Sequence, residues 1–132
     1  MIHISHLQAL VEHDTYTKNL NFKISIAESE HVQLTAPIDD LHCNGFGTPH
    51  GGYLVSLADC AAMYVAFMDG SHYVTQSCNF SFLRSTRSLS ELLVDSYILK
   101  RGKTVTVVHV EIHDSTKQLL CDGTFSCYRI SK

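Results

Sequence analysis

The stretch HCNGFGTPHGGYLVSLADCAAMYVAF, residues 42–67, joins a glycine-rich loop to a long apolar segment. From Gly51 to Phe67 the segment reads as one helix that is apolar around its circumference, which predicts burial on most sides. Its only charged residue is Asp59. An ionised carboxylate is costly to bury without a partner. Asp59 therefore either lies on the one helical face that reaches solvent or belongs to a functional site.

The segments around this helix alternate apolar and polar residues and are joined by short turns, as in an antiparallel sheet. They predict about six strands, over residues 20–26, 31–38, 73–83, 91–99, 104–113 and 118–130. In the third strand the alternation predicts one face with Val74, Gln76, Cys78, Phe80 and Phe82, and the other with Thr75, Ser77, Asn79 and Ser81. A short helix is expected over residues 5–13 with Ser5 as its N-cap. A sheet wrapped around the central helix gives an α+β fold, in a single domain over residues 1–132.

Composition narrows the possible functions of this 132-residue chain, whose net charge is −3. No basic run exceeds two residues, which argues against nucleic-acid binding. Asp59 near the middle of the apolar helix argues against a membrane span. The first residues have no signal-peptide pattern, and the five cysteines are odd in number and form no CxxC pair, so a reduced, cytoplasmic protein is expected. His109 and His113 have no evident third ligand, and no metal site is predicted.

The start of the central helix has features of a site that binds a carbonyl oxygen. The first N–H groups of a helix have no intrahelical acceptors, and the missing side chains of Gly51 and Gly52 let a ligand approach them. Asp59 follows Gly51 by eight residues, which is about 12 Å along a helix. One carbonyl cannot contact both groups in one chain. If both are catalytic, the site is shared between two subunits of a two-fold dimer.

The segment NGFGTPHGGYLVSLAD resembles the signature of the hotdog-fold acyl-CoA thioesterases, in particular their PaaI-like (phenylacetic acid degradation) branch. The matching residues are Asn44, His50, Gly51, Gly52 and Asp59. The segment NFSFLR, which ends at Arg84, is also similar to the strand that follows the helix in that family, and the resemblance extends from about Leu7 to Ile130.

The resemblance implies a hotdog fold, a homodimer that pairs into a tetramer, and an aromatic or medium-chain acyl-CoA substrate, with no cofactor or metal. The N–H of Gly51 would hold the thioester oxygen, and Asp59 of the other subunit would activate water or attack directly. Asn44 and Ser77 would orient the water or the carboxylate, and His50 would hold the loop or polarise the carbonyl. Gly52 and Arg84 would contact the substrate.

Two other functions stay open at this level. A hotdog dehydratase would need a histidine and an acid placed for proton transfer across the dimer, which the His-Gly-Gly and helical Asp pattern fits less well. A non-catalytic acyl-CoA-binding module would tolerate loss of Asp59. Ser85 after Arg84, Asn79 in the strand, and Pro49 before His50 depart from the usual family pattern and bear on CoA contacts and substrate choice.

Overall fold

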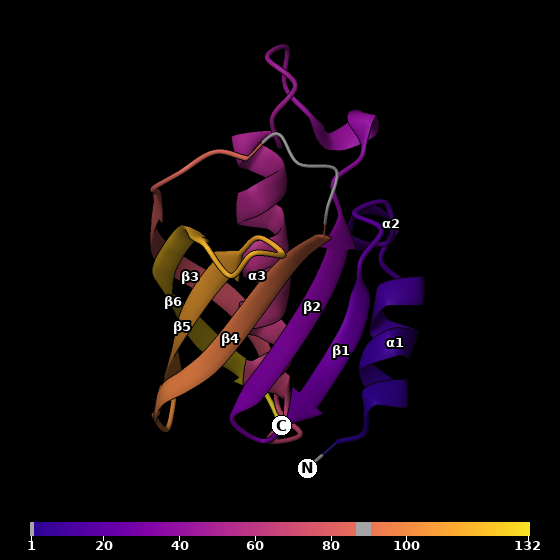
Figure 1. The fold of residues 1–132 in the computed structure, drawn as a ribbon. Coiled ribbons are helices and arrows are strands. Elements are labelled where there is room, and N and C mark those ends of the chain that lie inside the picture. The colour runs from indigo at the N-terminus through magenta and orange to yellow at the C-terminus, as the bar shows by residue number, and fades with distance from the viewer. Residues whose placement is uncertain (1, 87–90) are drawn as a thin grey trace.

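The computed structural model describes residues 2–86 and 91–132 and contains a six-stranded antiparallel sheet that curves around one long helix, α3 (Gly51–Phe67; Figure 1). The strand order is β1-β2-β4-β5-β6-β3. Their bounds are β1 Lys23–Glu28, β2 His31–Pro37, β3 His72–Phe82, β4 Glu91–Arg101, β5 Val105–His113 and β6 Leu119–Ser131. The predicted hotdog fold and the predicted bounds of the central helix are thus confirmed. No helix among the described residues has the length and apolarity needed to cross a membrane.

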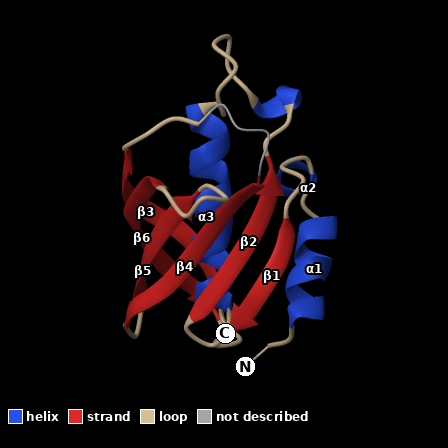
Figure 2. Ribbon diagram, in the orientation of Figure 1, coloured by secondary structure: helices blue, strands red, loops and turns tan. Residues whose placement is uncertain are grey.

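Three short elements lie outside the sheet (Figure 2): α1 (Ile4–Glu12), α2 (Thr15–Lys18) and the 3-10 turn η1 (Asp40–His42). The prediction of Ser5 as an N-cap was wrong, because His3 occupies that position and makes no capping hydrogen bond through its side chain. The first strand begins at Lys23 rather than at residue 20, since Asn21 has a φ of 58° that interrupts an extended chain.

Helix α3 is buried against the concave face of the sheet over most of its length. At its middle, Ser96 Oγ on β4 donates a 2.8 Å hydrogen bond to the carbonyl of Ala61. At its C-terminal end, Arg101 donates to the carbonyls of Val65 and Ala66 at 2.8 and 3.0 Å, which holds the last turn of the helix against β4. One stripe of α3 is less covered and contains Gly52, Ser56, Asp59, Met63 and Phe67. This stripe sets the direction from which a ligand or a second subunit can reach α3.

A β-bulge in β3 changes which side chains face the helix. Thr75 pairs with Cys127 and Cys78 pairs with Phe125, and both of these β6 partners are buried on the core face. Between them, Ser77 pairs with Ser126, so that three residues advance on β3 while two advance on β6. Paired residues share a face. The predicted alternation was therefore wrong at the start of the strand: Thr75 faces α3, and Ser77 lies on the opposite face of the sheet.

Candidate active site

The loop before α3 is held together by the side chain of Asn44. Its Oδ1 atom accepts hydrogen bonds from the backbone N–H of Phe46 at 2.9 Å, and from the N–H and hydroxyl of Thr48 at 3.2 and 3.1 Å. The backbone N–H of Asn44 donates to Thr48 O at 2.8 Å, and Gly47 takes a φ of 81°. Asparagine fits this position because its side-chain carbonyl can close a turn on its own backbone. The predicted site residue Asn44 thus has a clear part in shaping the loop.

A stacked histidine fixes the other end of the same loop. The ring of His42 lies flat against that of Tyr53 on α3, with 4.0 Å between ring centroids. Its Nε2 lies 2.9 Å from the carbonyl oxygen of Asn19, and its Nδ1 lies 2.9 Å from a carboxylate oxygen of Asp39. Burial, and then the nearby Asp39 carboxylate, raise the pKa of Tyr53. The phenol therefore stays neutral and donates to Leu20 O at 2.8 Å, which joins α3 to the segment before β1 and fixes the ring against which His42 stacks.

The first turn of α3 leaves a backbone donor at Gly51 for a ligand. His50 is the N-cap, and its Nδ1 accepts a 3.1 Å hydrogen bond from Gly52 N–H. In the part of the chain that the structure describes, Gly51 N–H donates to no group. A Cβ added at Gly51 would lie 3.5 Å from Cζ of Phe82, so that the ring covers one side of this glycine. The His50 side chain thus accepts the hydrogen bond of Gly52 N–H, and Gly51 N–H is left for a ligand.

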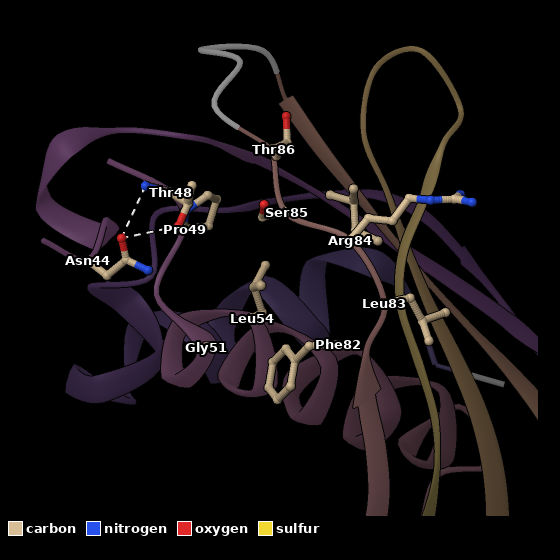
Figure 3. A pocket seen from close by; sticks show the side chains of 11 residues that line it. Asn44, Thr48, Pro49, Gly51, Leu54, Phe82, Leu83, Arg84, Ser85 and Thr86 are labelled. Atoms are coloured by element: carbon tan, nitrogen blue, oxygen red, sulfur yellow. Dashed lines mark hydrogen bonds between the residues drawn. The ribbon is translucent and has the colours of Figure 1, made fainter. Parts of the chain in front are cut away.

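Gly51 opens into a cavity of about 330 Å³ at the end of the sheet (Figure 3). The cavity lies between the Asn44–Pro49 part of the loop and the segment that follows β3, and its floor includes Leu54 and Phe82. Asn44, Gly51 and Arg84 are the predicted site residues that the structure brings together here. Figure 3 shows the Arg84 side chain extending away from Gly51 and Asn44. Its guanidinium is exposed and placed at the rim rather than over the Gly51 amide.

The other predicted site residues lie elsewhere in the chain. His50 and Gly52 line a separate groove beside Tyr53, and Asp59 borders a third cavity farther along α3. The Asp59 carboxylate accepts a hydrogen bond from the hydroxyl of Thr75 on β3. Ser77 lies on the far face of the sheet and does not face Asp59. Sequence reasoning missed Thr75, whose position depends on a bulge that the alternating pattern of the strand conceals.

Two other kinds of site were considered among the described residues: a nucleophilic thiolate at Cys60 and a metal centre. Burial raises the pKa of the Cys60 thiol to about 12, outweighing the opposing effect of a hydrogen bond with Thr17, so this neighbour of Asp59 is not a thiolate at neutral pH. No group of three or more histidine, cysteine or acidic side chains in residues 2–86 and 91–132 has an arrangement suited to a metal ion. Among the predicted site residues, the groups best placed for chemistry are the Asp59 carboxylate, with the Thr75 hydroxyl bonded to it, and the helix N-terminus at Gly51.

A sheet curved around a central helix, with a glycine pair at the helix start and a carboxylate two turns later, defines a hotdog protein with thioesterase-type residues. Residues 46–121 match the Thioesterase superfamily. The chain is 30% identical over 104 residues to acyl-coenzyme A thioesterase PaaI of Escherichia coli K12, covering 79% of this chain and 74% of that protein. It belongs to the Thioesterase superfamily, in the PaaI-like group, and is a thioester hydrolase of the acyl-CoA thioesterase type.

Solved structures agree with this assignment. The E. coli PaaI protein from the phenylacetic acid degradation operon superimposes with a TM-score of 0.89 at 26% identity, over 97% of this chain and 96% of that one. The smu.793 protein of Streptococcus mutans UA159, solved with acetyl-CoA, gives a TM-score of 0.82 at 30% identity, over 85% of this chain and 90% of that one.

Proposed function

We propose that this protein hydrolyses aromatic or medium-chain acyl-CoA thioesters at a site built by two subunits, with Gly51 from one and Asp59 from the other. The observation that carries the proposal is the division of the site residues within one chain. Asn44 and Gly51 line one cavity and Asp59 borders another. A base and an oxyanion donor must each come within about 3 Å of the reacting group. A second subunit supplies the missing half of each site.

The free edge of the sheet supports a dimer. β3 is an 11-residue edge strand that contains no Asp, Glu, Lys or Arg, and most of its side chains are exposed. An edge of this kind is a template for pairing with another strand. Thr75 connects β3 to Asp59, so the free edge lies beside the less covered stripe of α3. If two β3 strands pair antiparallel about a two-fold axis, the α3 helices of the two subunits also become neighbours.

In the proposed reaction the thioester carbonyl oxygen accepts a hydrogen bond from Gly51 N–H. Asp59 of the partner subunit takes a proton from water, the water oxygen bonds to the acyl carbon, and the C–S bond breaks to release CoA. The proton ends on the leaving thiolate. Direct attack by the carboxylate, with water then opening the mixed anhydride, uses the same two groups. Thr75 holds the carboxylate in position, and Asn44 fixes the loop that precedes the Gly51 donor.

The first test is thiol release from phenylacetyl-, benzoyl-, acetyl-, octanoyl- and palmitoyl-CoA by the wild type and by Asp59→Asn. We expect kcat to fall by about 10³-fold in the variant, since its near-isosteric amide cannot act as the base. Light scattering and circular dichroism should show an unchanged assembly and fold. Equal rates in the two proteins would refute the role of Asp59. CoA esters bound without turnover would instead indicate a binding module.

A mixing experiment tests whether the site is shared. Gly51→Pro removes the N–H donor, adds a ring beside Phe82 and keeps the helix start, because proline is favoured at the first helical position and His50 already has the φ of −64° and ψ of 137° that suit a residue before proline. A heterodimer of Gly51→Pro and Asp59→Asn contains one intact site and one doubly defective site. Subunits mixed at random should regain about a quarter of wild-type activity. No recovery after verified exchange would place the whole site in one chain.

A further inference from the structure

The cavity that borders Asp59 lies between the N-terminal helices and α3. Its volume is about 400 Å³, and it is separate from the cavity at Gly51. One wall comes from α3 and includes Met63, Tyr64 and Phe67, and the other comes from α1 and α2 and includes Leu10. Figure 1 shows α1 and α2 flanking the β1 side of the fold. The superfamily match begins at residue 46, so this second wall belongs to a part of the chain outside it.

The cavity wall is apolar where a ligand would contact it. The rings of Tyr64 and Phe67 lie 6.2 Å apart at a tilt of 50°, next to the flexible thioether side chain of Met63. The polar groups of the α2 wall bond to one another. The Asp14 carboxylate accepts a hydrogen bond from Thr17 N–H at 3.2 Å and a second from the Thr17 hydroxyl at 2.7 Å. The wall therefore has little need of hydrogen bonds from a ligand.

Two carboxylates give this cavity a negative electrostatic character. Asp14 and Asp59 both line it, and both carboxylates act to raise the pKa of Cys60 between them. Its lining also includes the exposed imidazole of His13 and contains no lysine or arginine. A negatively charged acyl group brought into this space would be repelled by the half-buried Asp59 carboxylate and, more weakly because it is exposed to solvent, by that of Asp14.

We infer that this cavity receives the acyl group of the substrate, and that α1 and α2 select uncharged acyl groups and limit their size. The inference rests on the proposed function. If Asp59 acts at the carbonyl carbon, the acyl chain attached to that carbon begins beside Asp59, while the CoA sulfur leaves on the other side. Asp59 borders this cavity and does not line the one at Gly51. An apolar cavity of about 150 Å³ accommodates benzene, so this space can hold a substituted ring or a medium-length chain.

Variants that narrow and widen the cavity test the size limit in opposite directions. Leu10→Trp should lower kcat/KM for octanoyl-CoA by about tenfold relative to acetyl-CoA, since losing a methylene-sized space already changes selectivity that much. Met63→Ala should shift the preferred chain length upward. Ile4→Trp is the matched control, because Ile4 lies on the same helix, is 38% exposed and is not part of the lining, and it should leave the ratio unchanged.

The charge preference is tested with hexanoyl-CoA and adipoyl-CoA, which differ by a terminal carboxylate. The wild type should prefer hexanoyl-CoA by about 100-fold or more, and Asp14→Asn should reduce the preference by about threefold. Asparagine caps a helix as well as aspartate does, so α2 should persist. Glu12→Gln is the control, because it removes an exposed carboxylate of α1 that pairs with Lys18 at 3.2 Å and is not part of the cavity lining.

The outcomes separate the two proposals. Unchanged chain-length ratios in both Leu10→Trp and Met63→Ala, in an active enzyme, would overturn the acyl-cavity inference and leave the proposed function intact. An unchanged hexanoyl-to-adipoyl ratio in Asp14→Asn would overturn the part assigned to charge. If the wild type releases thiol from none of these esters, the proposed function itself fails. Titration with the thioethers S-octyl-CoA and S-ethyl-CoA then still reports the cavity, because Leu10→Trp should weaken binding of the octyl compound alone.

Discussion

The two edges of the sheet differ in length, charge and covering. At one edge, β1 has six residues, includes Lys23 and Glu28, and has α1 beside it (Figure 1). At the other edge, β3 has 11 residues and exposes apolar side chains such as Val74 and Phe82, which are 46% and 54% exposed. Short, charged, covered edges are protected against pairing with other strands, whereas long uncharged edges favour it.

The difference between the two edges indicates that the β1 side stabilises the single chain and that the β3 side is suited to contact a second chain. The β1 side completes the fold of the single chain, because Leu7 of α1 is fully buried in the core. The β3 side holds Asp59 through Thr75 and leaves backbone groups open along its length. The same asymmetry fits the proposed shared site, in which the Asp59 carboxylate comes from one chain and the Gly51 donor from another.

The largest effect is expected from a charge at the middle of the free edge. Ser77 is the central residue of β3, so an antiparallel pair of β3 strands would bring the two Ser77 positions close together. Ser77→Glu should place like charges there, convert the proposed dimer to monomers in light scattering, and reduce kcat/KM by about 100-fold or more. Ser25→Glu on β1 is the matched control and should change neither property. A fully active dimer of Ser77→Glu would exclude this edge as the interface.

A smaller but still severe effect is expected where β3 joins the sheet. A Cβ at Gly123 of β6 would lie 2.3 Å from the carbonyl oxygen of Asn79 and 2.9 Å from Cα of Phe80. Gly123→Ala should therefore force β3 away from β6 and lower the free energy of unfolding by about 2–3 kcal/mol, measured by urea denaturation. Gly45→Ala is the control, since a Cβ there meets nothing within 4 Å. Similar stabilities of the two variants would contradict the tight contact.

The sequence was sufficient to predict six strands along the chain, the bounds of α3 and the placing of Gly51 and Asp59 in different cavities, but not the order of the strands in the sheet. These features depend on hydrophobic periodicity and helix geometry, which are local. The face assignment of Ser77 and Thr75 could not be predicted, because a bulge depends on how β3 and β6 pair, and pairing is a tertiary property. The cavity beside Asp59 could not be predicted either, because its walls come from segments about 50 residues apart that meet only in the folded chain.

A moderate effect on turnover is expected from the hydroxyl that connects β3 to Asp59. Thr75→Val keeps the shape of the side chain and removes this donor, so kcat should fall by about tenfold or more, as for other hydrogen bonds to charged groups. Thr75→Ser should restore most of kcat. Thr35→Val removes the hydroxyl that bonds Ser25 on the β1 side and should leave kcat unchanged. If KM changes instead of kcat in Thr75→Val, the hydroxyl contacts substrate rather than positioning the carboxylate.

The smallest expected effect is a pH dependence of the free energy of unfolding. It distinguishes the attachment of the β3 edge, which involves Asp69, from that of the β1 edge. Asp69 accepts hydrogen bonds from Tyr73 Oη at 2.6 Å and Ser71 N–H at 2.8 Å, and it lies 3.2 Å from Arg101 Nη1. Burial acts to raise the pKa of Asp69, but these hydrogen bonds and the guanidinium groups of Arg101 and Arg129 outweigh it and lower the pKa below its ordinary value of 3.8. This group thus ties the start of β3 to the end of α3.

Because the folded-state pKa of Asp69 is the lower one, its contribution to stability is complete above the ordinary pKa of 3.8 and is lost as the pH falls through the folded-state value. The free energy of unfolding of the wild type should therefore fall more between pH 7 and pH 3 than that of Asp69→Asn, in parallel urea titrations. In native-state hydrogen exchange at pH 3, amides of β3 should lose protection before those of β1, whose attachment through Leu7 is apolar and does not titrate. Equal loss at both edges would show that Asp69 does not specifically secure β3.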